Sequence, residues 1–189
     1  MNFPLSLTLA SKSPRRHYLL KEAGFEHKIV SIDVEETYPE NLKPEAVPRY
    51  LAVKKALAYK PQLSDNELVI TADTIVILHE KILGKPVDKD HAKHLLSILS
   101  GQTHMVVTGV CLASKKKQID FDDTTLVTFK MLSDEEIDYY IDNYNTLDKA
   151  GAYGAQEWMG MIAIKKIEGS YFNVMGLPVH LLYEKLKDF

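Results

Sequence analysis

Residues 68–86 constrain the fold more than any other part of the chain, because they place a carboxylate inside an apolar strand. Residues 68–70 and 75–78 are bulky or β-branched, which is typical of a buried β-strand. Asp73 lies between these two runs. Because an unpaired buried charge is costly, Asp73 either serves a cationic partner or a metal, or it ends one strand and turns the chain. The segment alone leaves both interpretations open.

The composition indicates an ordinary globular protein. The chain has 189 residues, of which 46% are hydrophobic and 26% charged, and we expect a single domain over residues 1–189. The net charge of −3 argues against nucleic acid as a partner. No apolar run approaches the ~18 residues that cross a bilayer, and the N-terminus lacks a basic leader, so we expect no membrane partner and a cytoplasmic location. The single cysteine, Cys111, lies in an apolar run and is interpreted as a packing thiol.

The strongest candidate for an anion site follows the first predicted strand, residues 5–10. Ser13 and Pro14 are typical of a helix start, with Ser as N-cap and Pro in the first turn. Arg15 and Arg16 follow, although the N-terminal end of a helix dipole repels cations. Two guanidiniums and the backbone amides of such a helix end converge on one point. This arrangement favours an anion, above all a phosphate, over the alternative of two solvated surface arginines.

Two lysines are candidates for contact with an anion. Lys85 lies between a glycine and a proline just after the central strand, and a carboxylate and a lysine on neighbouring segments of one sheet suit a metal-bound phosphate. A second helix is predicted to begin at Pro44 or Pro48 and to end near Tyr59. Lys55 lies on its apolar side, where it either extends toward solvent or reaches inward to an anion.

A group of acidic residues follows the second predicted strand, residues 27–32. Residues 33–36 contain three carboxylates, which form either a solvated loop or a hard-cation site. Mg²⁺ is commonly held by one or two carboxylates together with phosphate oxygens of a substrate. The sequence does not indicate whether Glu35 or Glu36 faces such a site.

The second half of the chain predicts further elements and one loop of interest. Asp88 caps a helix that ends at a Ser-Gly pair, residues 104–113 and 118–129 are two strands, Ser133 opens a capping box, and residues 158–166 are predicted to form a strand. A last helix begins after a Gly-Leu-Pro motif. In the loop of residues 148–156, Tyr153 and Gln156 are available for recognition of a base or ribose. The alternative is a plain surface turn with a packed tyrosine.

Taken together, these motifs resemble the Maf family of nucleoside triphosphate pyrophosphatases along essentially the whole chain. Each motif is weak alone, but their order and spacing are specific. The motifs that carry the resemblance are Leu-Ala-Ser-x-Ser-Pro-Arg-Arg (residues 9–16), Glu36, Lys55-Ala56, Ala72-Asp73-Thr74, Gly84-Lys85-Pro86, Leu99-Ser100-Gly101, Thr108-Gly109-Val110 and Gly176-Leu177-Pro178.

The resemblance implies an α/β fold, in which helices flank a long twisted mixed sheet and two lobes enclose a cleft, similar to inosine triphosphate pyrophosphatases. It also distinguishes subgroups. Arg15, Thr74 and Gln156 match members associated with dTTP and UTP, rather than a sister group that acts on 7-methyl-GTP. One departure is Glu157, where the family is expected to have glycine.

The resemblance further implies a division of roles for hydrolysis between the α- and β-phosphates. Arg15 and Arg16, with the turn of Ser11 to Ser13, would hold the phosphates, and Lys55 and Lys85 would offset their charge. Glu36 and Asp73 would bind Mg²⁺ or Mn²⁺, with Asp73 as the acceptor of the water's proton. Thr74, Gln156 and Tyr153 would contact the nucleoside. A homodimer is also implied.

Two alternatives remain at this stage. The enzyme could act on modified pyrimidine nucleotides, because one methyl group is worth only ~1–3 kcal/mol of discrimination. The chain could instead be a non-catalytic nucleotide-binding regulator of septum formation in cell division. The complete set of Glu36, Lys55, Asp73 and Lys85 argues against the second alternative, since a sensor needs no water-activating carboxylate.

Overall fold

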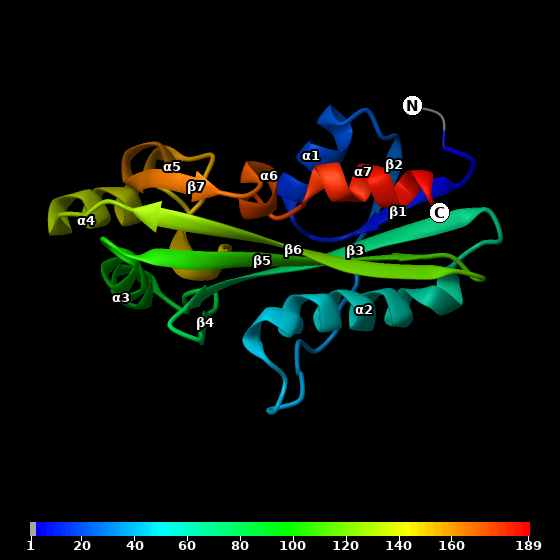
Figure 1. Cartoon of the computed structure of the whole chain (residues 1–189), viewed down its shortest axis with the longest axis horizontal. Helices are drawn as coiled ribbons and strands as arrows, with labels where there is room; N and C mark the ends of the chain where they lie inside the picture. The colour runs from blue at the N-terminus through cyan, green and yellow to red at the C-terminus, as the bar shows by residue number, and fades with distance from the viewer. Residues whose placement is uncertain (1–2) are drawn as a thin grey trace. The chain divides into compact units, whose positions relative to one another are not determined.

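A computed structural model describes residues 3–189 of the chain (Figure 1). No helix among these residues is long and apolar enough to cross a membrane. The strands are β1 (Ser6–Ala10), β2 (His27–Val30), β3 (Glu67–Leu78), β4 (Lys81–Leu83), β5 (Thr103–Ala113), β6 (Gln118–Phe129) and β7 (Ile164–Glu168). The α-helices are α1 (Pro14–Glu22), α2 (Val47–Tyr59), α3 (Lys89–Leu99), α4 (Asp134–Asn143), α5 (Trp158–Ala163), α6 (Tyr171–Val174) and α7 (Val179–Lys187). The short 3₁₀ helices are η1 (Pro44–Ala46), η2 (Lys60–Gln62) and η3 (Ala150–Ala152).

The strands form one mixed sheet in the order β2-β1-β3-β5-β6-β7, and β4 pairs with β3. β1 runs parallel to β2 and to β3, whereas β3 pairs antiparallel with β4, and β6 with β7. The predicted α/β class with a mixed sheet and flanking helices is therefore confirmed. The chain divides into two compact units, which we call unit 1 (residues 3–73, 108–123 and 176–189) and unit 2 (residues 74–107 and 124–175).

β3 is continuous through Asp73, so the interpretation that this residue ends a strand and turns the chain is wrong. Asp73 is buried, with 8% of its surface exposed. The residues on both sides of it are apolar enough to keep the strand in the interior, and the cost of burying the carboxylate is met by a partner rather than by a turn.

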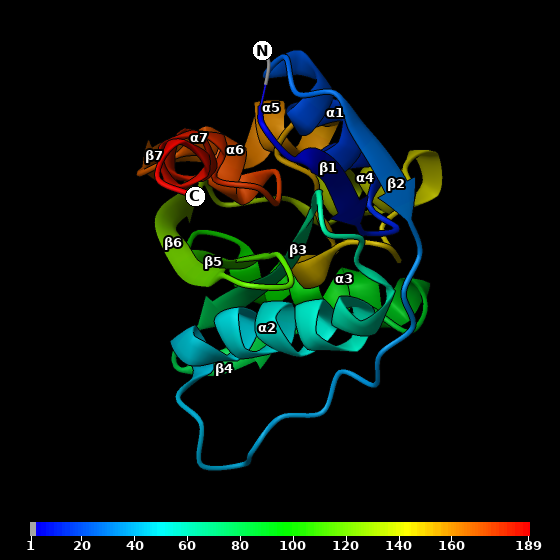
Figure 2. The same ribbon diagram turned by 90° about the vertical axis from the view of Figure 1, so that its right-hand side faces the viewer.

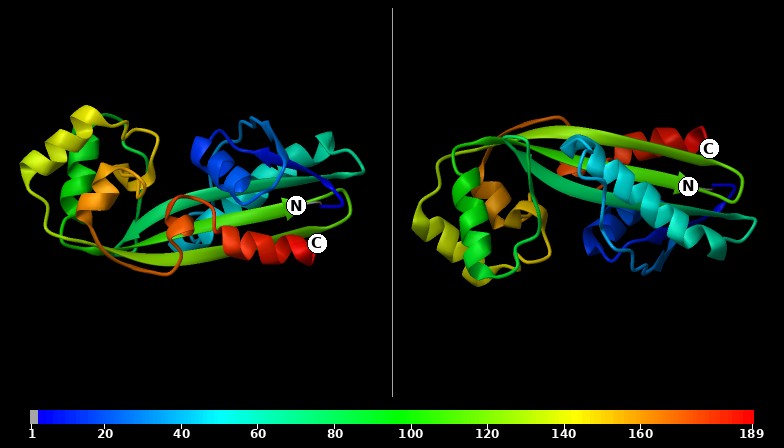
Figure 3. Two further views of the ribbon diagram at one scale, coloured as in Figure 1. Left: turned by 90° about the horizontal axis from the view of Figure 1, so that it is seen from above. Right: turned by 90° about the horizontal axis from the view of Figure 1, so that it is seen from below.

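In unit 1, helices cover both faces of the strands. α2 lies along one face, and α1 and α7 lie on the other (Figures 2 and 3). α2 approaches closely because its inward residues Ala52 and Ala56 are small and fully buried. Gly109 on β5 permits the same approach, since a Cβ there would lie 2.2 Å from the backbone nitrogen of Arg49. The thiol of Cys111 is buried in this core, which raises its pKa to about 12 and confirms a packing role.

Unit 2 has its own core, in which α3 packs against α4 and η3. Ser133 forms the predicted capping box with Glu136 at the start of α4. Within the core, the rings of His104, Phe129 and Tyr153 make edge-to-face contacts, with centroids 4.9–5.4 Å apart. His104 Nε2 lies 2.7 Å from the Tyr153 hydroxyl.

The prediction of a strand over residues 158–166 is wrong for residues 158–163 and correct for residues 164–166. The segment forms helix α5 and only then strand β7, because the buried residues Met159, Gly160 and Ala163 follow a helical rather than an alternating period. Gly160 lies directly on the preceding loop, where a Cβ would come 1.9 Å from the Ala155 carbonyl oxygen. A short apolar run does not distinguish a buried strand from a buried helix, and here packing on the loop decides.

The buried His104 makes the stability of the protein depend on pH. Burial lowers the pKa of its imidazole to about 4, whereas an unfolded histidine has a pKa of about 6.5. Between these values the unfolded chain binds a proton that the folded chain does not. The contribution of His104 is therefore complete above pH ~6.5 and declines as the pH falls toward about 4, by at most ~1.4 kcal/mol per pH unit. Urea unfolding across this range should give a shallower pH slope for His104→Gln than for wild type, and equal slopes would contradict the assignment.

Candidate active site

The centre of the candidate site is the ammonium group of Lys55, which lies between two carboxylates in unit 1. Lys55 Nζ donates to Asp73 Oδ1 at 2.6 Å and to Glu36 Oε1 at 2.7 Å. The side chains of Lys55 and Asp73 are only 13% and 12% exposed, whereas that of Glu36 is 52% exposed. Lys55 therefore reaches inward rather than toward solvent, and Glu36 is the member of the acidic loop that faces it.

A buried threonine fixes the position of Lys55. Thr71 Oγ1 donates to the Ala52 carbonyl at 2.7 Å, which sets the register of α2 on β3. Lys55 lies three residues after Ala52 on the same face of the helix, and Asp73 lies two residues after Thr71 on the same face of the strand. The hydrogen bond therefore brings the ammonium and the carboxylate together. The sequence motifs gave no indication of this role for Thr71.

The first turn of α1 supplies the second part of the site. Arg16 Nη1 donates to the Ala72 carbonyl at 2.8 Å, and Arg16 Nε donates to the Gly176 carbonyl at 2.8 Å. Because Ala72 precedes Asp73, these bonds attach the start of α1 to the strand that carries the carboxylate. Pro14 occupies the first turn as predicted. Arg15, which follows it, is half-buried.

Ser13 occupies the predicted N-cap position of α1, but its side chain does not act as a cap. The side chain of Ser13 makes no cap hydrogen bond, and its backbone N–H instead donates to Ser11 Oγ at 3.1 Å. Ser11 Oγ also lies 3.5 Å from Arg16 Nη1. Since no side chain caps this end of the helix and its first turn contains no acidic residue, the positive end of the dipole adds to the two guanidiniums.

The Asp73 carboxyl lies among cationic groups, and its environment suits a general base. Burial raises the pKa of the Asp73 carboxyl above its ordinary value, and the charges of Lys55 and Arg16 oppose this rise. Burial also lowers the pKa of the Arg16 guanidinium, against the attraction of Asp73, although an arginine remains charged in proteins. A carboxylate whose pKa is shifted toward neutrality is suited to accept a proton from water.

The loop that carries Glu36 is attached to α2 by a second lysine. Lys54 Nζ donates to Thr37 Oγ1 at 2.8 Å and to the Thr37 carbonyl at 3.0 Å. Adjacent lysines on one helix thus hold adjacent residues of the loop. This contact limits how far Glu36 can move from Lys55.

The donor set fits a divalent cation that is shared with a substrate. Among residues 3–189, no group of three His, Cys, Asp or Glu side chains could hold a metal ion. Two carboxylates, those of Asp73 and Glu36, already meet at one cationic group, the Lys55 ammonium. One or two carboxylates are the usual protein contribution to bound Mg²⁺, with phosphate oxygens and water as the remaining ligands.

The other candidate residues lie in unit 2. Thr74 is half-buried in β3, and Lys85 is exposed between β4 and α3. The segment of Lys85 is joined to the loop after α4, because the Gly151 N–H donates to the Gly84 carbonyl at 3.1 Å. Unit 2 therefore brings Lys85 and the Gln156 loop into one region.

Tyr153 and Gln156 differ in their environments. Tyr153 is buried with its hydroxyl bonded to His104, which favours the alternative of a packed tyrosine over contact with a substrate. Gln156 is half-buried, and its Oε1 is a buried oxygen with no hydrogen-bond partner among the described residues. A buried polar atom without a partner is uncommon in proteins, which makes this oxygen a candidate for contact with a ligand.

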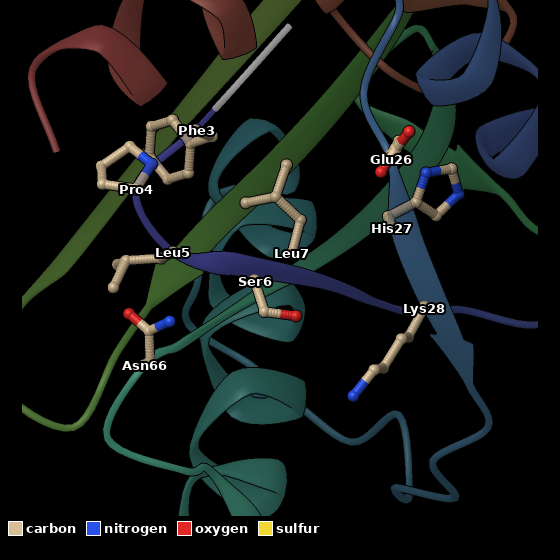
Figure 4. Close-up of a pocket in the computed structure, with 9 residues that line it drawn as sticks. All are labelled: Phe3, Pro4, Leu5, Ser6, Leu7, Glu26, His27, Lys28 and Asn66. Atoms are coloured by element: carbon tan, nitrogen blue, oxygen red, sulfur yellow. The ribbon is translucent and has the colours of Figure 1, made fainter.

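A separate pocket of about 450 Å³ lies at the start of β1 and β2 (Figure 4). It is lined by residues 3–7 and 26–28 and by Asn66. These residues lie at the amino ends of the parallel strands, whereas Ser11 and Arg16 follow the carboxyl end of β1. Ligands in open α/β sheets bind outside the carboxyl ends of strands, so we place the chemistry at Asp73 and not in this pocket.

Comparison with known proteins shows the family of this chain. The family model for Maf-like proteins matches residues 6–189. The chain belongs to the Maf family. A protein of Porphyromonas gingivalis named dTTP/UTP pyrophosphatase is 54% identical over 187 residues, which cover 97% of this chain and 94% of that protein. A protein of Phocaeicola vulgatus with the same name is 53% identical and covers 96% of this chain and 94% of its own length.

A solved structure supports the fold alone. The Ham1 protein of Staphylococcus aureus superposes with a TM-score of 0.54 over 97% of this Maf chain and 98% of its own, at 16% sequence identity. This similarity shows that the two proteins share a fold.

Proposed function

We propose that this Maf protein hydrolyses dTTP and UTP to the nucleoside monophosphate and pyrophosphate. The observation that carries the proposal is the buried Lys55–Asp73–Glu36 cluster, which lies next to the arginine-rich start of α1. Its near relatives in sequence, at 53–54% identity over almost their full lengths, are named for this activity. A carboxylate set among several cations suits a highly anionic substrate that reacts with water.

The phosphate chain of the substrate would be held by charge in unit 1. Arg15, Arg16 and the turn of Ser11 to Ser13 present guanidiniums and the positive end of a helix dipole to the phosphate oxygens. Lys55 offsets charge that develops as the α–β bond breaks, and Lys85 is proposed for the same task from unit 2. Such preorganised groups account for most of the acceleration in phosphoryl transfer.

Asp73 is proposed as the acceptor of the proton from the attacking water. Its burial raises the pKa of the carboxyl, and Lys55 keeps the carboxylate oriented at 2.6 Å. Glu36 and Asp73 would hold Mg²⁺ or Mn²⁺ together with the substrate. When bound, the metal would polarise the water and the phosphate oxygens. The homodimer that the resemblance implies and the cytoplasmic location that the sequence suggests stay predictions.

Gln156, with Thr74 and Arg15, is proposed to select the base. Uracil and thymine present carbonyl acceptors beside a ring N–H, and an amide that both donates and accepts complements that edge. The Oε1 atom of Gln156 has no partner within the described chain, which supports a ligand there. A site built for hydrogen bonds to one base edge rejects bases that leave its polar groups unpaired.

The role of Asp73 is tested by Asp73→Asn, which keeps the shape of the side chain and removes its capacity as a base. We expect UTP turnover, measured as pyrophosphate release with Mg²⁺, to fall at least about 100-fold, while the melting temperature shows that the protein still folds. Asp65→Asn is the matched control, because Asp65 makes only an exposed ion pair with Lys115. Retention of more than roughly a tenth of the wild-type rate would show that Asp73 is not the base.

The role of Gln156 is tested by Gln156→Glu, which replaces an amide donor with a carboxylate that only accepts. We expect the ratio of kcat/KM for UTP to that for GTP to fall at least about tenfold, the effect of one lost hydrogen bond. The exposed Gln102→Glu variant carries the same change of charge away from the loop. An unchanged ratio in Gln156→Glu would show that this residue does not recognise the base. A substrate panel with dTTP, CTP, 7-methyl-GTP and modified pyrimidines would define the preferred base.

A further inference from the structure

A buried cation supports the loop that carries Gln156. Lys149 is only 5% exposed, and its ammonium forms ion pairs with Asp148 at 2.8 Å and with Glu157 at 3.0 Å. It also donates to the Asn145 carbonyl. A buried lysine is costly unless it is paired, so these contacts hold the ammonium in one place beneath the loop.

A buried tyrosine joins the two ends of the same loop. The Tyr140 side chain is fully buried, and its hydroxyl accepts from the Gly154 N–H at 3.1 Å and donates to the Glu157 carboxylate. The Glu157 N–H donates in turn to the Gly154 carbonyl at 3.1 Å. Gly154 and Glu157 are the residues that enclose Ala155 and Gln156. One hydroxyl therefore fixes both ends of the turn from which Gln156 projects.

The amide of Gln156 lies directly over this support. A Cβ added to Gly154 would meet Gln156 Nε2 at 2.9 Å, so the side chain rests on the residue that Tyr140 holds. The Oε1 atom of the same amide is the buried oxygen without a protein partner. The amide thus rests on a fixed backbone, and its oxygen has no partner within the described chain.

The structure also gives a role to the departure at residue 157. Glycine in that position would leave Tyr140 and Lys149 without their shared carboxylate. Truncating one partner of a buried hydrogen-bonded charge pair leaves the other unpaired and costs stability. Glu157 is therefore coupled to Tyr140 and Lys149, rather than being a change confined to the loop.

We propose that Tyr140, Glu157 and Lys149 form a positioning group that holds Gln156 for recognition of the pyrimidine base. The group does not touch the reacting phosphates, and it acts only through the conformation of the loop. The inference rests on the proposed role of Gln156 in base selection. Loss of the Tyr140 hydroxyl should therefore weaken discrimination between bases more than it weakens turnover of a bound substrate.

The decisive variant is Tyr140→Phe, which removes one hydroxyl and keeps the ring. We expect the KM for UTP to rise roughly tenfold, the kcat to stay within about threefold, and the UTP-to-GTP ratio of kcat/KM to fall about as far as the KM rises. Tyr139→Phe is the matched control, because the ring of Tyr139 is half exposed and contacts Trp158 in a tilted arrangement. A merely structural role for Tyr140 would lower the activity toward all substrates equally and leave the ratio unchanged, which would overturn the proposal.

A second readout does not depend on activity. The Gly154 N–H is bonded to Tyr140, so hydrogen exchange of residues 150–157 should be faster in Tyr140→Phe than in wild type, and unchanged in Tyr139→Phe. Equal exchange in the two variants would overturn the proposal. If Tyr140→Phe does not fold, Glu157→Gln takes its place, because a glutamine offers one acceptor where Tyr140 and Lys149 both donate. Its control is Glu168→Gln, because Glu168 makes an exposed ion pair with Lys166.

The two proposals can fail separately. If Gln156→Glu changes the UTP-to-GTP ratio and neither Tyr140→Phe nor Glu157→Gln does, the base-reading role stands and the positioning group is overturned. If Gln156→Glu leaves the ratio unchanged, the base-reading role is overturned, and the positioning group is overturned with it.

Discussion

The site depends on one buried contact, that of the Lys55 ammonium with the Asp73 carboxylate at 2.6 Å. A carboxylate in the middle of an apolar strand is costly to bury, and a lysine from a facing helix reduces the cost. Several neighbouring residues of unit 1 bring these two groups together. Small residues on α2 and Gly109 on β5 allow the close approach, and Thr71 fixes the register. Glu36 then contacts Lys55 from the acidic loop, and Arg16 of α1 donates to the carbonyl of Ala72, the residue before Asp73.

The two units carry different parts of the proposed chemistry. Unit 1 contains the buried base and the cations for the phosphates, whereas unit 2 contains Lys85 and the loop of Gln156. The two sets of polar groups are stabilised in different ways. In unit 1, the charges contact each other directly, and substrate or metal would have to share those contacts. In unit 2, Lys149 and Tyr140 bond to Glu157 and Gly154, on either side of Gln156. The side-chain oxygen of Gln156 itself has no hydrogen-bond partner among the described residues.

Much of the fold could be predicted from sequence, because hydrophobic period and capping residues are local signals. The capping box at Ser133 and the strands over residues 104–113 and 118–129 are examples. The prediction of a strand that begins at residue 158 was wrong, because the hydrophobic pattern gives no sign that Gly160 packs against the Ala155 backbone. The membership of Asp73, Lys55, Glu36 and Arg16 in one site was a prediction from motifs, and the structure brings these four residues together. The supporting roles of Thr71, Tyr140 and Lys149 could not be predicted, since each depends on a partner 8–19 residues away in the chain.

The most direct test of the account is hydrolysis of UTP with Mg²⁺ in water enriched in oxygen-18, followed by mass spectrometry of both products. The account places the attacking water at Asp73 and the developing charge on the α-phosphoryl group and the departing pyrophosphate. It therefore predicts UMP and pyrophosphate in equal amounts, with the heavy oxygen in UMP. Heavy oxygen in pyrophosphate, or release of orthophosphate, would contradict it.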